Sequence, residues 1–119
     1  MGLNWLTSVL GLLLIVNFVT AIQWDFEFGN KNELYARELT EKEGEIGPFA
    51  YRNFYKLDVP SLSQVTYVRV TVWSLNPPKV DYDWKTNTVS IVYSFVQVPI
   101  STFKIHADGY PYILKEIKG

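Results

Sequence analysis

The chain has 119 residues, no cysteine, and eleven Lys or Arg against twelve Asp or Glu, which leave a formal net charge of −1. This balance argues against nucleic-acid binding and against electrostatic binding to an anionic membrane, both of which require a basic surface. The missing cysteines exclude disulfides, thiolate metal sites and thiol chemistry. Aromatic residues make up 16% of the chain, so we expect a domain that folds around buried rings rather than a disordered one.

The first 21 residues carry no charged side chain. Val9–Val16 has the length of the hydrophobic region of a secretory signal peptide, and Val19-Thr20-Ala21 fits the pattern that signal peptidase cleaves. We therefore expect a signal peptide over residues 1–21, one mature domain over residues 22–119, secretion to the extracellular space, and no stable membrane span after cleavage. The alternative is retention of Trp5–Ile22 as an anchor, because its 18 residues approach the length that crosses a bilayer.

Alternating apolar and polar residues predict β-strands in the first half of the mature chain. The run from Trp24 to Phe28 predicts one strand, whereas Leu34–Leu39 is compatible with a strand or a short helical turn. Glu41–Pro48 is charged and contains two glycines and a proline, which predicts a loop. Extended structure resumes over Phe49–Val59.

The second half contains the clearest strand, Val65–Trp73, in which valines alternate with polar residues. Val80–Trp84 and Val89–Phe95 predict two further strands joined by a hairpin at Lys85-Thr86-Asn87. These patterns place the core on the residues that share the apolar faces, namely Val68, Val70, Val72, Val89, Ile91, Tyr93 and Phe95.

Pro99 interrupts the pattern, so Ile100–His106 is expected to be a separate or bulged strand. Asp108-Gly109 predicts a turn, and Tyr110–Ile117 is either a final short strand or a tail. About six to eight short strands with no convincing helix in the mature chain predict an all-β fold, an antiparallel sandwich or a small barrel.

The candidates for acid–base or glycoside-hydrolysing chemistry are His106, the only histidine, and the pair Asp81 and Asp83. Asp108 can share a strand face with His106 only if the strand continues past residue 106, and no nucleophile motif accompanies them. A solvent-facing strand explains Asp81 and Asp83 more simply. We therefore expect no catalytic residue, no metal site and no cofactor.

Aromatic rings give the ligand-binding candidates Tyr82, Trp84 and Trp73. Rings in a row can form a flat surface on which a sugar or an aromatic ligand stacks, with Asn76 or Asn87 as hydrogen-bonding partner. The competing interpretation, which the alternating carboxylates favour, places Tyr82 and Trp84 in the core.

Three short segments, Phe26–Lys31, Val65–Val68 and Phe103–Tyr110, resemble the small secreted insect family named after multiprotein bridging factor two. The resemblance implies a cysteine-free, secreted all-β domain and supplies no catalytic residue. The chain departs from the family pattern at Lys85–Thr88, where a Gly-Gly pair is usual, and at Asn32-Glu33, where an acidic residue closer to the first glycine is usual.

These features predict a small secreted, non-enzymatic binding protein whose partner is an unknown protein or small molecule. The alternatives are an extracellular carrier of a small apolar ligand and, as the family name implies, a transcriptional coactivator. A hydrolase that uses Asp81 and Asp83 or His106 is a further alternative from a different class.

Overall fold

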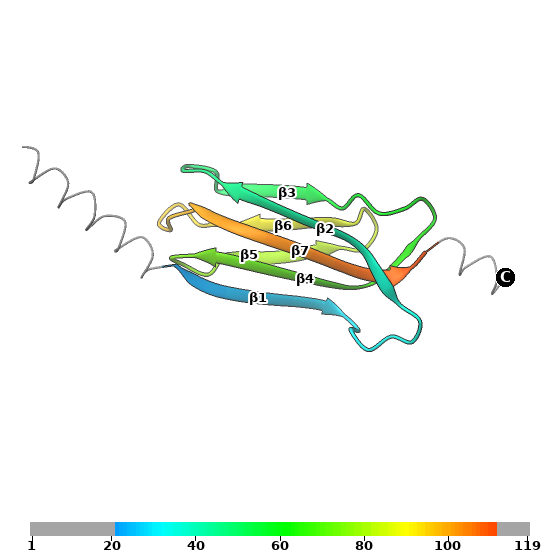
Figure 1. Ribbon diagram of the computed structural model, residues 1–119. Helices are drawn as coiled ribbons and strands as arrows, with labels where there is room; N and C mark the ends of the chain where they lie inside the picture. Colours follow the sequence, from blue (N-terminus) through cyan, green and yellow to red (C-terminus); the bar gives the residue numbers. More distant parts are fainter. Residues whose placement is uncertain (1–20, 112–119) are drawn as a thin grey trace, which may run out of the picture.

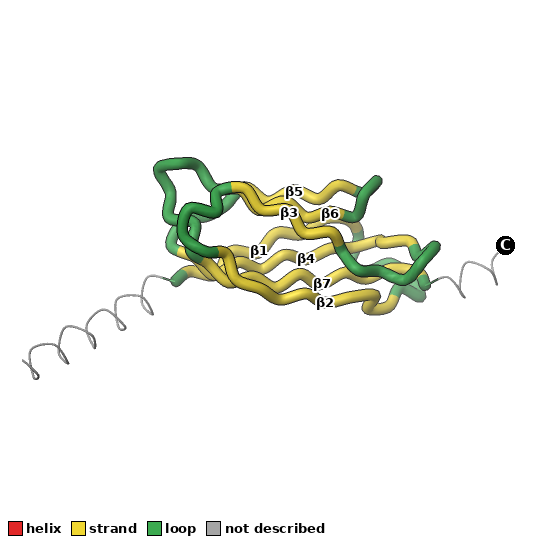
Figure 2. Tube along the Cα trace, turned by 90° about the horizontal axis from the view of Figure 1, so that it is seen from above, coloured by secondary structure: helices red, strands yellow, loops and turns green. Residues whose placement is uncertain are grey.

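The computed structural model describes residues 21–111, which form seven β-strands in two antiparallel sheets (Figure 1). The four-stranded sheet has the order β1-β4-β7-β2 and the three-stranded sheet the order β3-β6-β5, and Figure 2 shows the two sheets as stacked layers. The strands are β1 (Ile22–Gly29), β2 (Arg37–Ile46), β3 (Arg52–Lys56), β4 (Gln64–Ser74), β5 (Lys79–Asp83), β6 (Thr88–Val92) and β7 (Ser101–Tyr110). The all-β sandwich predicted from the alternating pattern is thereby confirmed.

Residues 1–20 of the expected signal peptide and most of the segment Tyr110–Ile117 lie outside the described residues. Between residues 21 and 111, no helix is long and apolar enough to cross a membrane.

The core lies between the sheets and follows the period-two pattern of the strands. Val70 of β4 is opposite Ile105 of β7, and both side chains are fully buried, as is Ile91 from β6 of the other sheet. Burying one such side chain contributes about 1.5–3 kcal/mol relative to leaving it in water. One cluster joins both sheets: Ile46, Leu57, Val65, Val68, Val70, Val72, Val80, Tyr82, Val89, Ile91, Tyr93, Phe103, Ile105 and Ala107.

The predicted hairpin is present, whereas β3 and β6 are shorter than the strands predicted there. The hairpin at Lys85-Thr86-Asn87 connects β5 to β6, and the extended segment Phe49–Val59 contributes the strand β3 only over Arg52–Lys56. The ambiguous segment Leu34–Leu39 is divided between a turn and the start of β2 at Arg37.

The loop predicted over Glu41–Pro48 is wrong, because β2 continues to Ile46 and pairs with β7 throughout. Gly44 is one of the two glycines behind the loop prediction, yet it lies opposite Phe103, where an added Cβ would approach the ring to 2.6 Å. The glycine therefore makes room for a core aromatic ring. The charges in this segment fit an edge strand, whose exposed side has to discourage pairing with other chains.

The turn predicted at Asp108-Gly109 is also wrong, since both residues lie inside β7. At Gly109 an added Cβ would come within 2.0 Å of the Gln64 carbonyl oxygen and 2.7 Å of Leu39 Cδ1. Glycine is required here by the close approach of the neighbouring strands. Both neighbours carry a β-bulge at this level, β2 between Glu38 and Thr40 and β4 between Val65 and Tyr67.

The assignment of Phe95 to the core is wrong as well. β6 ends at Val92, and the chain leaves the sheet into the connection that leads to β7. Tyr93 is still buried, but Phe95 is 86% exposed. The alternation of apolar and polar residues continues past the end of the strand, so the pattern alone predicts core residues that are in fact exposed.

Candidate functional site

The outer face of the four-stranded sheet is polar and hydrogen-bonded across its strands. Thr71 donates to Asp25 Oδ1 at 2.7 Å, and Arg69 lies 3.5 Å from the same oxygen. The Thr71 hydrogen bond is the largest cause of a lowered pKa at Asp25. Tyr67 donates to Glu27 at 2.7 Å, and burial together with this bond raises the pKa of Tyr67 to about 12. These contacts hold β1 and β4 in register on the solvent side.

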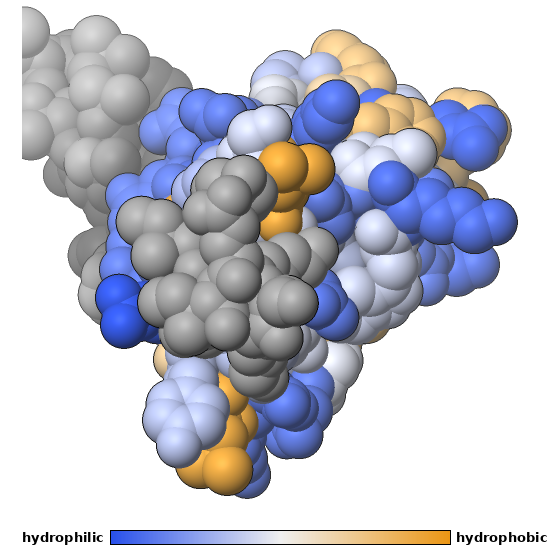
Figure 3. Space-filling view, turned by 90° about the vertical axis from the view of Figure 1, so that its right-hand side faces the viewer, coloured by the Kyte–Doolittle hydropathy of each residue, from blue (hydrophilic) through white to orange (hydrophobic). Residues whose placement is uncertain are grey.

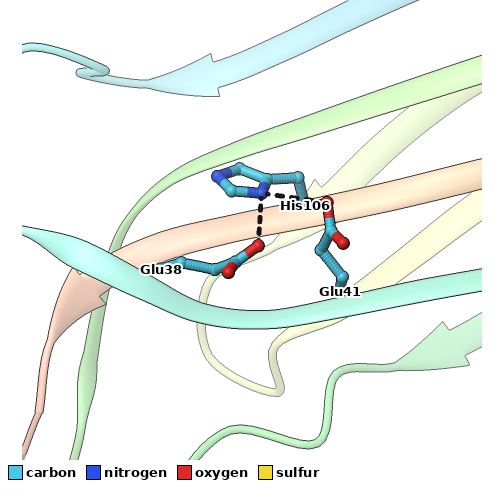
Figure 4. A group of neighbouring side chains, drawn as sticks. All are labelled: Glu38, Glu41 and His106. Atoms are coloured by element: carbon cyan, nitrogen blue, oxygen red, sulfur yellow. Dashed lines mark ion pairs between the residues drawn. The ribbon is translucent and has the colours of Figure 1, made fainter.

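His106 lies on this face with three carboxylates around its ring, a group that we call the His106 cluster (His106, Glu38, Glu41 and Asp108). Nδ1 is 3.2 Å from Glu38 Oε1 and 3.6 Å from Glu41 Oε1, and Nε2 is 2.7 Å from Asp108 Oδ1. Figure 4 shows Glu38 and Glu41 reaching from β2 toward the same nitrogen of His106 on β7. The His106 side chain is 29% exposed, so the cluster is open to solvent.

The bulge in β2 creates this convergence. Glu38 and Glu41 are three residues apart, so a regular strand would place them on opposite faces of the sheet. The register shift between Glu38 and Thr40 changes the alternation, and Glu38 pairs with Asp108 while Glu41 pairs with His106. Sequence reasoning missed both glutamates, because residue spacing gives no sign of a bulge whose position depends on the paired strand.

The cluster combines one imidazole ring with three carboxylates. Within residues 21–111, the hydrogen-bonding and ionic contacts of the His106 ring are all to carboxylates, so no hydroxyl nucleophile is placed against it. Asp81 and Asp83 do not join the cluster, since they project from β5 of the three-stranded sheet. The backbone N–H of Lys85 donates to Asp83 and is the largest cause of its lowered pKa.

The aromatic candidates do not form a single platform. Tyr82 is a buried core residue that donates to Asn87 Oδ1 at 2.7 Å, and burial is the main cause of a pKa raised to about 12. Trp84 is 47% exposed in the β5–β6 turn and contacts the Tyr82 ring edge-on, with the ring centroids 4.8 Å apart. Trp73 is half-buried on β4, in the other sheet.

The second candidate surface is one end of the sandwich. The connections β2–β3, β4–β5 and β6–β7 meet there, beside the first residue of β1 (Figure 1). We call this surface the apolar loop end and define it by the loops 47–51, 75–78 and 93–100, none of which contains a charged residue. It carries half of the exposed large hydrophobic side chains of the described residues, namely Phe49, Leu75, Phe95, Val96, Val98 and Ile100, and the exposed Ile22 of β1 lies beside it.

The opposite end has a different composition. Its loops, 30–36, 57–63 and 84–87, contain the charged residues Lys31, Glu33, Asp58 and Lys85. Figure 3 looks at this end, where the visible hydrophobic residues form separate small groups among hydrophilic ones. The two ends of the sandwich are therefore not equivalent.

Several polar groups of the apolar loop end form hydrogen bonds between the loops, whereas the buried Tyr93 hydroxyl has no hydrogen-bond partner among the described residues. Asn76 donates to the Val98 carbonyl at 2.9 Å, and Gln97 donates to the Pro77 carbonyl at 3.0 Å. The Tyr93 amide donates to the Tyr51 carbonyl at 2.7 Å. A hollow of about 810 Å³ opens beside these loops and is lined in part by Trp73, Leu75, Val98 and Ile100. Of the three aromatic candidates, Trp73 is the one that lines this hollow.

No family model, no curated protein and no solved structure matches this chain.

Proposed function

We propose that the chain is a secreted, non-enzymatic binding protein that docks through its apolar loop end onto a lipid membrane surface. The observation that carries the proposal is the concentration of exposed hydrophobic side chains on three uncharged loops at one end of the sandwich. Exposed apolar patches of this kind mark sites of interaction with proteins or membranes. We also propose that the protein is secreted and that it belongs to the family named after multiprotein bridging factor two.

A membrane is favoured over a polar partner by the hydrogen bonds within the loops. Transferring an unpaired polar group into an apolar environment costs several kcal/mol, and a charge costs more. Here the amides of Asn76 and Gln97 already donate to carbonyls of neighbouring loops, and the loops contain no ionised side chain. The apolar loop end can therefore leave water at low cost.

The surroundings of the loops also fit a membrane surface. Arg52 and Lys79 both pair in register with Val92, at the end of the three-stranded sheet next to the loops, and both are exposed. Their long side chains can reach lipid headgroups while the loop tips enter the interface. The apolar segment 1–20 joins the domain at Ala21, which also lines the hollow at this end. If the segment 1–20 were retained as a membrane anchor, it would also bring the apolar loop end to the membrane.

Vesicle binding tests the proposal with a matched pair of double variants. The untagged protein, purified from the medium of secreting cells, is expected to float with phosphatidylcholine vesicles. Phe95→Asp with Val96→Asp should lower the partition coefficient at least about tenfold, because two apolar groups no longer enter the interface. Leu34→Asp with Leu62→Asp, at the opposite end, is the control and should leave the partition coefficient unchanged. Equal binding by both double variants, or failure of the unmodified protein to bind, would contradict the proposal.

An extracellular carrier of a small apolar ligand is the second candidate, and the hollow of about 810 Å³ favours it. This volume is within the range of small-molecule sites. The space between the sheets is filled by the core cluster, so a ligand would bind at the apolar loop end rather than inside the sandwich. In the vesicle experiment, lipid extracted into solution in a one-to-one complex would indicate a carrier instead of a membrane-docking protein.

A further inference from the structure

We propose that the His106 cluster is a zinc site in which His106 Nδ1, Glu38 and Glu41 are the ligands and Asp108 orients the histidine ring. The proposal is independent of membrane docking, because the cluster is on the outer face of the four-stranded sheet. It differs from the expectation of no metal site, because in a regular strand Glu38 and Glu41 would lie on opposite faces.

The spacing of the ligand atoms fits a tetrahedral ion. With metal–ligand distances of about 2.0–2.2 Å, neighbouring ligand atoms of a tetrahedral zinc ion lie about 3.4 Å apart. Nδ1 is 3.2 Å from Glu38 Oε1 and 3.6 Å from Glu41 Oε1, which brackets this value. All three ligand atoms lie within 4.8 Å of one another, so rotation of the exposed glutamate side chains is enough to close the third edge.

Asp108 determines which nitrogen is available to the metal. Its carboxylate lies 2.7 Å from Nε2, so in the zinc complex it would accept a hydrogen bond from a protonated Nε2 and leave Nδ1 to the metal. A carboxylate that accepts from the second ring nitrogen is the usual partner of a zinc-bound histidine, because it fixes the tautomer and the ring orientation. The lone pair of neutral His106 is then at Nδ1, which faces Glu38 and Glu41.

The carboxylates around Nδ1 attract positive charge. The Nδ1 lone pair and two carboxylates would repel one another, so either a second proton on the ring or a metal ion has to lie between them. Lys104 Nζ is 3.3 Å from Glu41 Oε1 and supplies one positive charge to the group. With neutral His106, three carboxylates and Lys104 leave a formal charge of about −2, which a divalent ion neutralises.

The mixture of ligands favours zinc over calcium or magnesium. Calcium and magnesium take oxygen ligands, whereas zinc combines an imidazole nitrogen with carboxylate oxygens and leaves a fourth position to water. Zinc is therefore the expected ion, and excess calcium should not displace it.

Calorimetric titration of the untagged secreted protein with zinc tests the site. We expect one zinc per chain, loss of saturable binding in His106→Gln, and about a 10- to 100-fold weaker affinity in Asp108→Asn, the range expected for a partner of a ligand. Glu38→Gln should weaken binding strongly. Glu43→Gln is the matched control, because Glu43 is on the same strand but pairs with Lys104 rather than with His106.

The histidine ring provides a readout that separates coordination from a loss of folding. His106 is the only histidine, so nitrogen-15 spectra of its ring report which nitrogen binds the ion. A zinc-dependent shift of Nδ1, with the proton retained on Nε2, is expected. Three results would each overturn the proposal. The first is equal zinc binding by His106→Gln and the unmodified protein, and the second is an equal loss of affinity in Glu43→Gln and Glu38→Gln. The third is a set of ring resonances that zinc does not shift. Urea midpoints measured without zinc identify any variant that fails to fold.

Discussion

The segment from β6 into the following loop contains the same kinds of side chain in two opposite environments. Val89 and Ile91 are fully buried between the sheets, whereas Phe95 and Val96, a few residues later, are 86% and 94% exposed. The residue types and their spacing hardly change between the two regions, but the strand ends at Val92. Hydrophobicity along the sequence thus identifies side chains that can be buried. Whether a given side chain is buried depends on where its residue lies in the folded sandwich.

The buried and the exposed apolar side chains also have different roles. Apolar side chains between the sheets stabilise the fold, because folding removes them from water. Apolar side chains at the apolar loop end remain in contact with water and gain that free energy only when a partner covers them. Substitutions in the interior should therefore change the free energy of unfolding, and substitutions at the loop end should change binding.

The largest effect is expected for Ile91→Ala. This side chain is fully buried in the middle of the core, so its truncation should lower the free energy of unfolding by about 2–5 kcal/mol. Ser90→Ala, on the other face of β6, is the control and should cost far less. Urea midpoints measure both changes. Similar midpoints for the two variants would show that the interior face of β6 is assigned wrongly.

A smaller effect, from crowding rather than from a cavity, is expected for Gly109→Ala. The added methyl group would meet the Gln64 carbonyl oxygen, a backbone atom that cannot rotate away, so we expect a loss of about 1–3 kcal/mol. Gly47 is in a loop of the apolar loop end and has no atom within 4 Å of an added Cβ. Gly47→Ala should therefore leave the thermal midpoint nearly unchanged, and equal losses in both variants would contradict the close approach at Gly109.

The smallest effect on stability is expected for Val96→Ala. Because Val96 is 94% exposed, its truncation should change the free energy of unfolding by no more than about 0.5 kcal/mol. The same substitution at Val89, which is fully buried, should be clearly destabilising. Chemical unfolding of this pair compares the two regions directly. A large loss at Val96 would mean that the loop packs against the domain in solution.

The sequence predicted the parts of the fold that depend on local alternation. Val68, Val70 and Val72 alternate with polar residues, and all three are buried as expected. The hairpin at Lys85-Thr86-Asn87 was predictable because turn residues separate two alternating runs. Both features are encoded within a few consecutive residues, so they need no knowledge of the neighbouring strands.

Glycines and charged residues led to wrong loop and turn predictions at positions where packing against a neighbouring strand determines the residue type. Gly44 supported a predicted loop and Gly109 a predicted turn, but each makes room for atoms from another strand, Phe103 in one case and Gln64 in the other. A glycine that permits a turn and a glycine that permits close packing are the same residue in the sequence. The partner strand distinguishes them, and sequence spacing does not identify that partner.

By itself, the sequence determined the fold class, the core valines and the uncharged composition of the loops 47–51, 75–78 and 93–100, since these follow from residue type and short-range periodicity. Only the tertiary structure brought those loops together at one end, because their meeting depends on which strands pair. It also decided that Glu38 and Glu41 face His106, through a bulge whose register is set by β7. Contacts between residues far apart in the chain come from strand pairing, and strand pairing minimises the free energy of the whole sandwich rather than of any one segment.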